Sequence, residues 1–422
     1  MKKVLVVGRG GREHVLAWKL KQSVSVEGVY VAPGNDGMAD VATQVDISET
    51  DVQGLIEFAK NRSIDLTIVG PEAPLTEGIV NRFKEEGLKI FGPTKEAALI
   101  EGSKQFAKQM MQAYNIPTAA YKTFSNEQDA KAYVDKTGVP IVIKADGLAA
   151  GKGVVVASTA QEANAAIEDF LCNQKFGEAS RTIVIEEFLE GEEFSLMAFV
   201  NGDAVYPMDI SQDHKRAFDG DEGPNTGGMG AYSPVSQISD SVQKRAVYEI
   251  LKPAAEALVK EGRPYQGILY VGLINTDDGP KVIEFNARFG DPEAQVVLPR
   301  LENDLLQVME DVMNQKPVKL SWKDEACVGV VLASSGYPDT YDKGQELPNL
   351  DRIHSNAHVF HAGTKLKQGK WTTNGGRLLL VAAENSSLEK AREQVYEEMK
   401  KLNSDHTFYR KDIAQKAFTV RQ

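Results

Sequence analysis

Short apolar runs alternate with amphipathic stretches over the first hundred residues. Apolar runs occur at KVLVVG (3–8), VEGVYVAPG (26–34), DLTIVGPE (65–72) and KIFGP (89–93). Stretches with helical spacing lie between them, for example DVQGLIEFAKNR (51–62). Strands that alternate with helices in this way predict an α/β layer built on a parallel sheet. In such a sheet the ligand-binding groups gather at the carboxyl ends of the strands.

The first of these strands runs into a glycine turn. Three strand ends carry turn residues, at Gly8–Arg12, Pro33–Asn35 and Gly70–Glu72. A glycine turn that opens a helix leaves backbone N–H groups free to bind a phosphate monoester. The turn is not the GxGxxG dinucleotide fingerprint, because Glu13 stands at the third glycine position. We therefore interpret it as a phosphate site, with an ordinary turn as the alternative.

Residues 139–157 predict two strands joined by a loop of small residues, ADGLAAGKG. A Walker A loop would open a helix and would have Ser or Thr after its lysine, whereas Gly153 follows Lys152. We expect instead a flap that covers nucleotide phosphates, with Lys144 pointing at them from the end of the first strand. A mobile surface hairpin is the alternative.

An acidic junction follows at TIVIEEFL (182–189), an apolar strand that leads into the strand pair EGEEFSLMAFVNGDAVYPM. The backbone amides of such a hinge suit an adenine edge, while Glu193 would reach ribose hydroxyls; a hairpin with a solvated acidic turn is the alternative. The segment QDHKRAFDGDEGPNTGGMGAYSP (212–234) is polar and rich in glycine. It predicts a long binding loop without secondary structure.

The hairpin GILYVGLINTDDGPKVIEFNARF (267–289), with its turn at residues 277–279, combines two faces of opposite character. Because side chains alternate along a strand, its second strand places Glu284, Asn286 and Arg288 on one face, and Ile283, Phe285 and Phe289 on the other. Magnesium prefers hard oxygen ligands and shares its shell with substrate phosphates. The polar face predicts a site for Mg²⁺ and a phosphate, with a solvated edge strand as the alternative.

Composition narrows the class of protein. A chain of 422 residues exceeds one ordinary core, so we expect several domains, the last a compact α+β domain at 326–422. A net charge of -12 argues against non-specific nucleic-acid binding. Cys172 and Cys327 form no CxxC pattern, which argues against a disulfide scaffold or a zinc site. The amino-terminal apolar run is too short for a signal peptide and no run approaches a membrane span, so we expect a cytoplasmic protein.

Seven fragments, taken together and in order, resemble a known family. They are GRGGREHVLAWK, KADGLAAGKGVVV, EEFLEGEEFS, QDHKR, GPNTGGMGAYSP, EFNARFGDPE and FHAGT. Their order and spacing closely resemble the glycinamide ribonucleotide synthetase family of the ATP-grasp superfamily, over essentially the whole chain. The resemblance implies a Rossmann-like N-terminal domain at 1–102, a central ATP-grasp domain at 103–325 with a flap subdomain at about 120–190, and the α+β C-terminal domain.

The resemblance also implies roles for individual residues. Those facing ATP phosphates are Lys104, Lys144 and the flap 147–153, including Gly151 and Gly153. Those at the adenine and ribose are Glu186, Glu187, Leu189 and Glu193. The implied ligands of Mg²⁺ or Mn²⁺ are Glu284 and Asn286. The implied catalytic residues are Lys144, Asp291 and Arg288, the last meeting the glycine carboxylate or the transferring phosphoryl group. The implied substrate residues are Gly10, Gly11 and Asn35 for phosphoribosylamine, and Asn225, Thr226, Gly227, Gly228, Met229 and Gly230 closing over the substrates.

The activity implied is an ATP-dependent C–N ligation in purine synthesis, by a monomer that acts on small molecules and has no nucleic-acid or membrane partner. ATP, glycine and 5-phosphoribosylamine would give ADP, phosphate and glycinamide ribonucleotide through glycyl phosphate. Three alternatives stay open: an ATP-grasp ligase using formate or bicarbonate, an NAD(P)-linked oxidoreductase, and a nucleotide-sensing binding protein. One departure is that GILYVGLI lacks the further metal carboxylate that many ATP-grasp enzymes supply from this strand.

Overall fold

The N-terminal part of the chain is a parallel α/β layer. The computed structural model describes residues 1–149 and 152–418. The strands of this layer, in sheet order, are β3 (Thr43–Gln44), β2 (Val26–Pro33), β1 (Lys2–Gly8), β4 (Leu66–Val69) and β5 (Ile90–Phe91). Its helices are α1 (Gly11–Lys21), α2 (Val52–Arg62), α3 (Glu72–Glu77), α4 (Ile79–Glu85) and α5 (Lys95–Gly102). The parallel α/β layer predicted from the sequence is confirmed.

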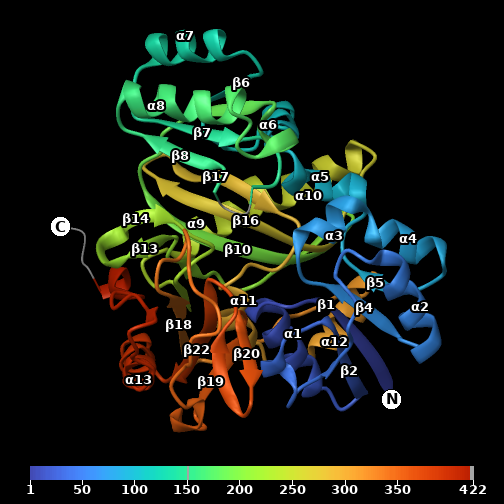
Figure 1. The fold of residues 1–422 in the computed structure, drawn as a ribbon. Helices are drawn as coiled ribbons and strands as arrows, with labels where there is room; N and C mark the ends of the chain where they lie inside the picture. The colour runs from blue at the N-terminus through green and yellow to red at the C-terminus, as the bar shows by residue number, and fades with distance from the viewer. Residues whose placement is uncertain (150–151, 419–422) are drawn as a thin grey trace.

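A small antiparallel sheet with its own core lies at the top of the molecule (Figure 1). Its strands, in sheet order, are β6 (Tyr121–Phe124), β9 (Ile183–Glu187), β7 (Ile141–Ala145) and β8 (Val154–Ala157). Helices α7 (Glu127–Thr137) and α8 (Ala160–Ile167) pack against it through a hydrophobic cluster that includes Val134, Ile143 and Phe170. Because this core is separate from the others, the small sheet forms a unit of its own.

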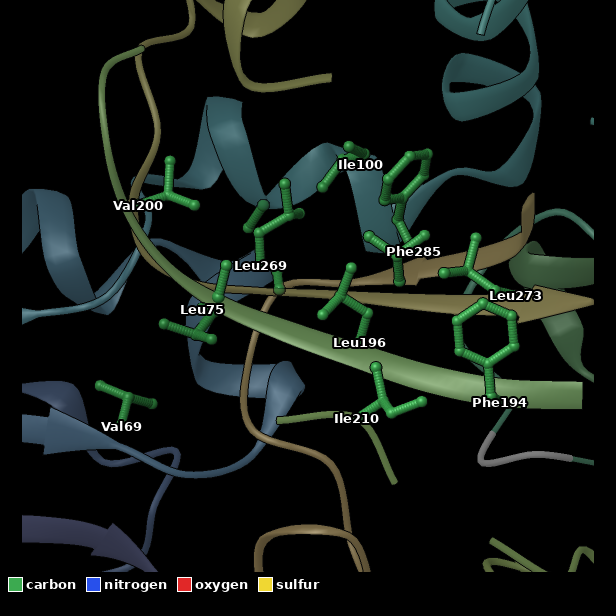
Figure 2. Close-up of a cluster of buried hydrophobic side chains, with 14 of the residues drawn as sticks. Val69, Leu75, Ile100, Phe194, Leu196, Val200, Ile210, Leu269, Leu273 and Phe285 are labelled. Atoms are coloured by element: carbon green, nitrogen blue, oxygen red, sulfur yellow. The ribbon is translucent and has the colours of Figure 1, made fainter. Parts of the chain in front are cut away.

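A larger antiparallel sheet lies below the small one (Figure 1). Its strands, in sheet order, are β11 (Ala204–Pro207), β10 (Glu192–Asn201), β16 (Gln266–Thr276) and β17 (Gly279–Asn286), and the neighbouring helices are α6 (Lys104–Ala113), α9 (Asp240–Arg245) and α10 (Lys252–Lys260). Figure 2 shows Leu196, Leu269 and Phe285 of this sheet in one hydrophobic cluster with Leu75 and Ile100 of the N-terminal helices. This shared core holds β17 beside the N-terminal layer.

The C-terminal sheet combines strands from two parts of the chain. Along the sheet lie β12 (Gln212–Asp213), β15 (Gly230–Ser233), β18 (Ala326–Ser334), β22 (Arg377–Asn385) and β19 (Ala357–His361), and β23 (Thr407–Phe408) also pairs with β18. Two separate hairpins are β13 (Arg216–Phe218) with β14 (Glu222–Asn225), and β20 (Thr364–Lys367) with β21 (Lys370–Thr373). The remaining α-helices of the described residues are α11 (Ala294–Val297), α12 (Leu305–Met313) and α13 (Leu388–Lys400). No helix in the described part of the chain is long and apolar enough to cross a membrane.

The expectation of a structureless loop at 212–234 was wrong. This segment forms β12, β13, β14 and β15, and all four residues of β15 are buried. Residues 230–233 pair with residues 327–330 of β18, almost a hundred positions later. Glycine-rich sequence has low strand propensity, but pairing with a buried strand overrides propensity. The segment is therefore anchored in the C-terminal sheet.

The predicted alternation along β17 was wrong at one residue. Gly272 pairs with Glu284 and Leu273 pairs with Val282, so Ile283 is an extra residue in a β-bulge. The bulge puts Val282 and Phe285 in the core and leaves Ile283 only half-buried. A bulge redirects the residues around it. Here it turns the Ile283 carbonyl to Lys144.

Candidate functional site

Lys144 joins the small sheet to the larger one. It stands at the end of β7, and its Nζ lies 3.0 Å from Glu186 Oε1 and 3.1 Å from Glu186 Oε2. The same ammonium group donates to the Ile283 carbonyl oxygen at 2.9 Å. Glu186 belongs to β9, so one buried lysine contacts two strands from different sheets. The strand-end position predicted for Lys144 is confirmed.

Glu186 has a second lysine partner that the sequence analysis missed. Lys108 Nζ lies 3.0 Å from Glu186 Oε2 and donates to Thr118 Oγ1 at 2.8 Å. Burial lowers the pKa of Lys108 to about 8, although Glu186 opposes the shift. The available signal was spacing, because Lys108 follows Lys104 by one helical turn on α6 and therefore shares its face. The ammonium groups of Lys108 and Lys144 thus both contact the Glu186 carboxylate.

Lys104 lies at the start of α6, against the loop expected to form the flap. Its Nζ donates to the Gly147 carbonyl oxygen at 3.2 Å. Burial and then Lys144 lower the pKa of Lys104, while Glu284 opposes them. The other end of the loop is held where Ala145 donates its N–H to the Gly153 carbonyl at 2.8 Å. Gly151 lies outside the described residues.

Glu284 and Asn286 stand two residues apart at the end of β17, a spacing that favours one side of the strand for both side chains. Burial would raise the pKa of Glu284, but Lys215, Lys144, Lys104 and Arg288 together lower it. The carboxylate is therefore ionised at neutral pH. Arg288 Nη2 donates to Asn286 Oδ1 at 3.2 Å, which places the guanidinium beside the amide. One carboxylate and one amide oxygen form a hard donor set that suits Mg²⁺ sharing its shell with phosphate oxygens.

Arg288 is held by two carboxylates from the N-terminal part of the chain. Its Nη2 lies 3.1 Å from Glu101 Oε1, and its Nε lies 3.5 Å from Glu72 Oε2. These carboxylates raise the pKa of Arg288 well above its usual value despite burial. Glu101 Oε2 also accepts from the Ala287 N–H at 2.7 Å. The sequence analysis named Glu72 only as part of a strand end and missed Glu101.

Lys215, which follows β12, lies among two further carboxylates, those of Glu193 and Asp213. Its Nζ lies 2.9 Å from Glu193 Oε2 and 3.9 Å from Asp213 Oδ1. Lys215 lowers the pKa of Glu193, so this carboxylate is ionised. Burial raises the pKa of Asp213 to about 7 against the effect of Lys215, and Glu293 adds to the increase. Glu193 therefore faces a cation at the start of β10, beside the junction with β9.

The other two junction residues differ in exposure. The Glu187 N–H donates to the Ala120 carbonyl at 2.9 Å, and Glu187 Oε2 accepts from the Ala120 N–H at 3.2 Å. The side chain of Glu187 is exposed and Leu189 is half-buried. The structure thus fixes Glu187 through residue 120 and leaves Leu189 at the surface of the junction.

The glycine turn lies beside Asp291. A Cβ atom added to Gly10 would stand 3.5 Å from Asp291 Oδ2, and one added to Gly11 would stand 2.7 Å from Gln295 Nε2. Gln295 Nε2 donates to Asp291 Oδ1 at 2.9 Å, so the two side chains that line the glycine turn are bonded to each other. The Asn35 amide instead donates to the carbonyl oxygens of Arg9 and His361, at 2.7 and 3.0 Å. Asn35 thereby ties the turn to β19.

Arg377, on β22, connects this turn with the glycine-rich segment, and the sequence analysis missed it. Its Nη1 lies 3.2 Å from Asp291 Oδ1 and donates to the carbonyl oxygens of Gly227, at 2.7 Å, and Gly228, at 3.3 Å. Arg377 and then Arg12 lower the pKa of Asp291 against the effect of burial. Nothing near Arg377 in the sequence marks it, because its contacts lie 86 to 150 positions away.

The segment 225–230 is only partly at the site. Asn225 ends β14, and the Thr226 hydroxyl donates to the Lys215 carbonyl at 2.8 Å and accepts from the Gly228 N–H at 3.0 Å. The Met229 side chain is fully buried in the core, and Gly230 begins β15. The structure therefore places residues 225–228 near Arg377 and Lys215, and directs Met229 away from them.

Family models and known proteins agree on the relatives of this chain. Phosphoribosylglycinamide synthetase models match as the N domain over residues 2–101, the ATP-grasp (A) domain over 102–294 and the C domain over 327–416. A phosphoribosylamine–glycine ligase of Halalkalibacterium halodurans is 61% identical over 418 residues, covering 99% of this chain and 98% of the relative. One of Listeria innocua is 58% identical over 417 residues, covering 98% and 99%.

Solved structures show the same architecture. The phosphoribosylamine–glycine ligase of Thermotoga maritima superimposes with a TM-score of 0.84 at 33% identity, covering 97% of this chain and all of that one. A biotin carboxylase of Campylobacter jejuni, at 15% identity and a TM-score of 0.75, shares the fold alone. Family models match most of the chain, and relatives share more than half of its residues, so the family of the chain is established. The chain belongs to the phosphoribosylglycinamide synthetase family and is an ATP-dependent ligase of the ATP-grasp superfamily.

Proposed function

We propose that the protein joins glycine to 5-phosphoribosylamine at the expense of ATP, giving ADP, phosphate and glycinamide ribonucleotide through glycyl phosphate. The observation that carries this proposal is that Lys144 joins the two antiparallel sheets, through Glu186 at 3.0 Å and the Ile283 carbonyl at 2.9 Å, directly beside Glu284. Lys215, Lys144, Lys104 and Arg288 lower the pKa of Glu284, which keeps this carboxylate ionised. Cations around a carboxylate that faces an amide oxygen suit a metal–triphosphate beside an acid substrate. The names of the relatives add the identity of the substrates.

The nucleotide would lie between the two antiparallel sheets. Lys104 and Lys144 contact its phosphates, and the loop 147–153, with Gly151 and Gly153, covers them. Glu186, Glu187, Leu189 and Glu193 hold the adenine and ribose. Lys144 already joins the sheets through Glu186 and the Ile283 carbonyl, which supports its place at the phosphates. Glu284 and Asn286 would hold Mg²⁺ or Mn²⁺, which would supply positive charge beside the transferring phosphoryl group.

Arg288 orients the glycine carboxylate for attack on the γ-phosphorus of ATP. Its guanidinium is fixed by Glu101 and lies beside Asn286, which supports this role. The carboxylate oxygen forms a bond to phosphorus as the bond to ADP breaks, and glycyl phosphate results. The amine of phosphoribosylamine then attacks the acyl carbon, phosphate leaves, and the amine loses a proton. Catalysis rests on positioning and charge, without a side-chain nucleophile.

Phosphoribosylamine would lie at the glycine turn. Of the two glycines, Gly11 would offer its N–H to the phosphate, because the Gly10 N–H already donates to Glu13 Oε2 at 2.6 Å, and Asp291 lies beside Gly10. Asn35 supports the turn, and residues 225–230 close over the substrates, with Met229 and Gly230 anchoring the segment in the sheet. Arg377 adds a cation beside Asp291.

We place the domain divisions at 1–102, 103–325 and 326–422, with the flap subdomain at about 120–190.

The deciding experiment is an ADP-release assay with glycine and freshly generated phosphoribosylamine. The proposal expects release that needs both substrates and a divalent cation. Release with formate or bicarbonate in place of glycine would identify a different ATP-grasp ligase, and nucleotide binding without turnover would identify a sensor. Binding of a nicotinamide cofactor would favour an oxidoreductase.

We also propose that the protein is a monomer in the cytoplasm. Size-exclusion chromatography with light scattering would test the oligomeric state, and cell fractionation would test the localisation.

A further inference from the structure

Among the described residues, the β13–β14 hairpin is not hydrogen-bonded into a larger sheet, and Phe218 contacts Phe408 of β23 with ring centroids 5.9 Å apart. Its two strands pair with each other, and in the described part of the chain they join no other strand. The turn between them spans residues 219–221, and much of the hairpin is exposed, including half of the Phe218 surface. A two-stranded hairpin alone is at best marginally stable in water. Contacts from outside the hairpin must therefore hold it in place.

Arg410 supplies such contacts from the C-terminal part of the chain. Only 1% of its side chain is exposed, and its Nη1 donates to the Arg216 carbonyl at 3.0 Å and to Asp221 Oδ1 at 2.9 Å. Its Nε and Nη2 bind the two carboxylate oxygens of Asp412, at 2.8 and 2.7 Å. A bidentate pair of this kind fixes the plane of the guanidinium. The group is therefore aimed at β13 by its own neighbour in sequence.

The residues around Arg410 contact the same turn. Asp412 Oδ2 accepts from the Gly220 N–H at 2.8 Å, and the Lys411 N–H donates to Asp219 Oδ1 at 2.7 Å. Lys416 Nζ lies 2.5 Å from Asp221 Oδ2. Every residue of the turn thus binds to the segment 410–416. The turn of the hairpin, residues 219–221, is therefore held by hydrogen bonds and ion pairs to the segment 410–416.

The inner end of the hairpin leads directly into the proposed nucleotide site. Arg216 follows Lys215, whose Nζ contacts Glu193 at 2.9 Å. The Lys215 carbonyl accepts from the backbone N–H of Thr226, at 2.7 Å, and from its hydroxyl, at 2.8 Å. Thr226 comes immediately before Gly227, which Arg377 contacts. A shift of the hairpin would therefore move the Lys215–Glu193 pair and the glycine-rich segment together.

We infer that Arg410, fixed by Asp412, is a positioning residue that holds the β13–β14 hairpin so that Lys215 and Glu193 are placed for the nucleotide. This inference rests on the proposed nucleotide site. Arg410 acts through the Arg216 carbonyl and the turn, and it does not contact the substrates. A segment near the end of the chain thereby sets the affinity of a site built by the central sheets.

A buried arginine can also act on stability alone, so the test needs a matched control. Arg300 is equally buried, at 4% exposure, and donates to Asp209 Oδ2 at 2.8 Å and to the Glu325 carbonyl at 2.7 Å. It makes no contact with the hairpin among the hydrogen bonds of the described residues. Arg300→Gln therefore measures the general effect of losing a buried guanidinium.

The experiment combines hydrogen exchange with binding of a non-hydrolysable ATP analogue and Mg²⁺, both on the full chain. We expect Arg410→Gln to raise amide exchange of residues 216–228 and to weaken the analogue roughly tenfold, about 1.4 kcal/mol. Arg410→Lys should give an exchange rate and an analogue affinity between those of Arg410→Gln and wild type. Arg300→Gln should lower the melting temperature and leave both readouts at wild-type values. If Arg410→Gln does not fold, Asp412→Asn carries the same expectations.

Wild-type exchange and affinity in a folded Arg410→Gln would overturn the inference. So would equal changes in Arg300→Gln, or faster hairpin exchange with unchanged affinity. Neither readout needs turnover, so these outcomes are distinct from a failure of the ligase activity in the ADP-release assay. Analogue binding that never involves residues 193 and 215 would instead contradict the proposed nucleotide site.

Discussion

Arg288 Nη2 donates to Asn286 Oδ1 at 3.2 Å, so the residue proposed for the glycine carboxylate and one proposed metal ligand share a hydrogen bond. Asn286 ends β17 and Arg288 follows two residues later, and the same Nη2 also lies 3.1 Å from Glu101 Oε1. The acid substrate and the metal-bound phosphates would therefore meet at adjacent protein groups. Effects of mutation at either group should appear in the chemical step.

Replacing Glu284 by Gln removes one negative charge from a group held ionised by Lys215, Lys144, Lys104 and Arg288. We expect kcat/KM to fall at least a hundredfold, a loss of about 2.7 kcal/mol of transition-state stabilisation, because divalent cation is held less firmly. ADP release measured over a range of Mg²⁺ concentrations checks this. Glu256→Gln, at an exposed position of α10, is the control and should retain activity. Near-normal turnover of a folded Glu284→Gln variant would refute the metal role.

Glu101→Gln weakens the anchor of Arg288 without touching the nucleotide lysines. The guanidinium would lose its charged partner at 3.1 Å. We expect kcat/KM for glycine to fall roughly tenfold while the KM for ATP stays within a factor of about two. Steady-state kinetics with each substrate varied in turn measures the split. A change confined to ATP would show that Arg288 serves the nucleotide instead.

An acyl-phosphate intermediate predicts isotope exchange in ATP. If glycyl phosphate forms reversibly while ADP stays bound, the β-phosphoryl oxygens of ADP can rotate before ATP re-forms. Bridging label between the β- and γ-phosphates should therefore scramble when glycine is present and phosphoribosylamine is absent. Nuclear magnetic resonance of labelled ATP detects the exchange, and a sample without glycine is the control. No scrambling under conditions that permit rotation and reversal would leave the intermediate unsupported.

Three buried histidines predict loss of stability in mild acid. Burial lowers the pKa of His14 and His214 to about 3 and that of His361 to about 4, and His361 and Arg410 add to the shifts of His14 and His214 respectively. In the unfolded chain each group titrates near 6.5. Because the folded values are lower, the unfolded state alone binds these protons as pH falls below 6.5. Stability is therefore full above this pH and is lost towards pH 4, by up to about 1.4 kcal/mol per histidine for each pH unit.

Urea unfolding at pH 7.5 and 5.5 measures this loss. His14→Gln should make the decline with pH shallower by about one histidine's share, since two buried imidazoles remain. His406→Gln, at an exposed position, is the control and should leave the slope unchanged. Equal slopes for wild type and His14→Gln would show that His14 is not the group that takes up the proton.

Local pattern in the sequence determined much of the fold. Runs of apolar residues placed the strands of the N-terminal sheet, and the Asp-Asp-Gly turn placed the β16–β17 hairpin, because strand and turn preferences act over a few neighbouring residues. The same period of two predicted one face for Glu284, Asn286 and Arg288, of which β17 contains the first two. The strand end that carries Lys144 was also readable, since it needs only the boundary between an apolar run and a loop.

Only the tertiary structure decided which groups meet those residues. The bulge at Ile283 depends on the partner strand, and the burial of β15 depends on a strand almost a hundred positions later. Glu101, Arg377 and Arg410 reach the site or its supports across sheets or domains, so no local period marks them. The sequence by itself thus determined the faces and ends of the elements, because these follow from backbone geometry. Long-range packing decided the charge partners, because it alone brings distant side chains within bonding distance.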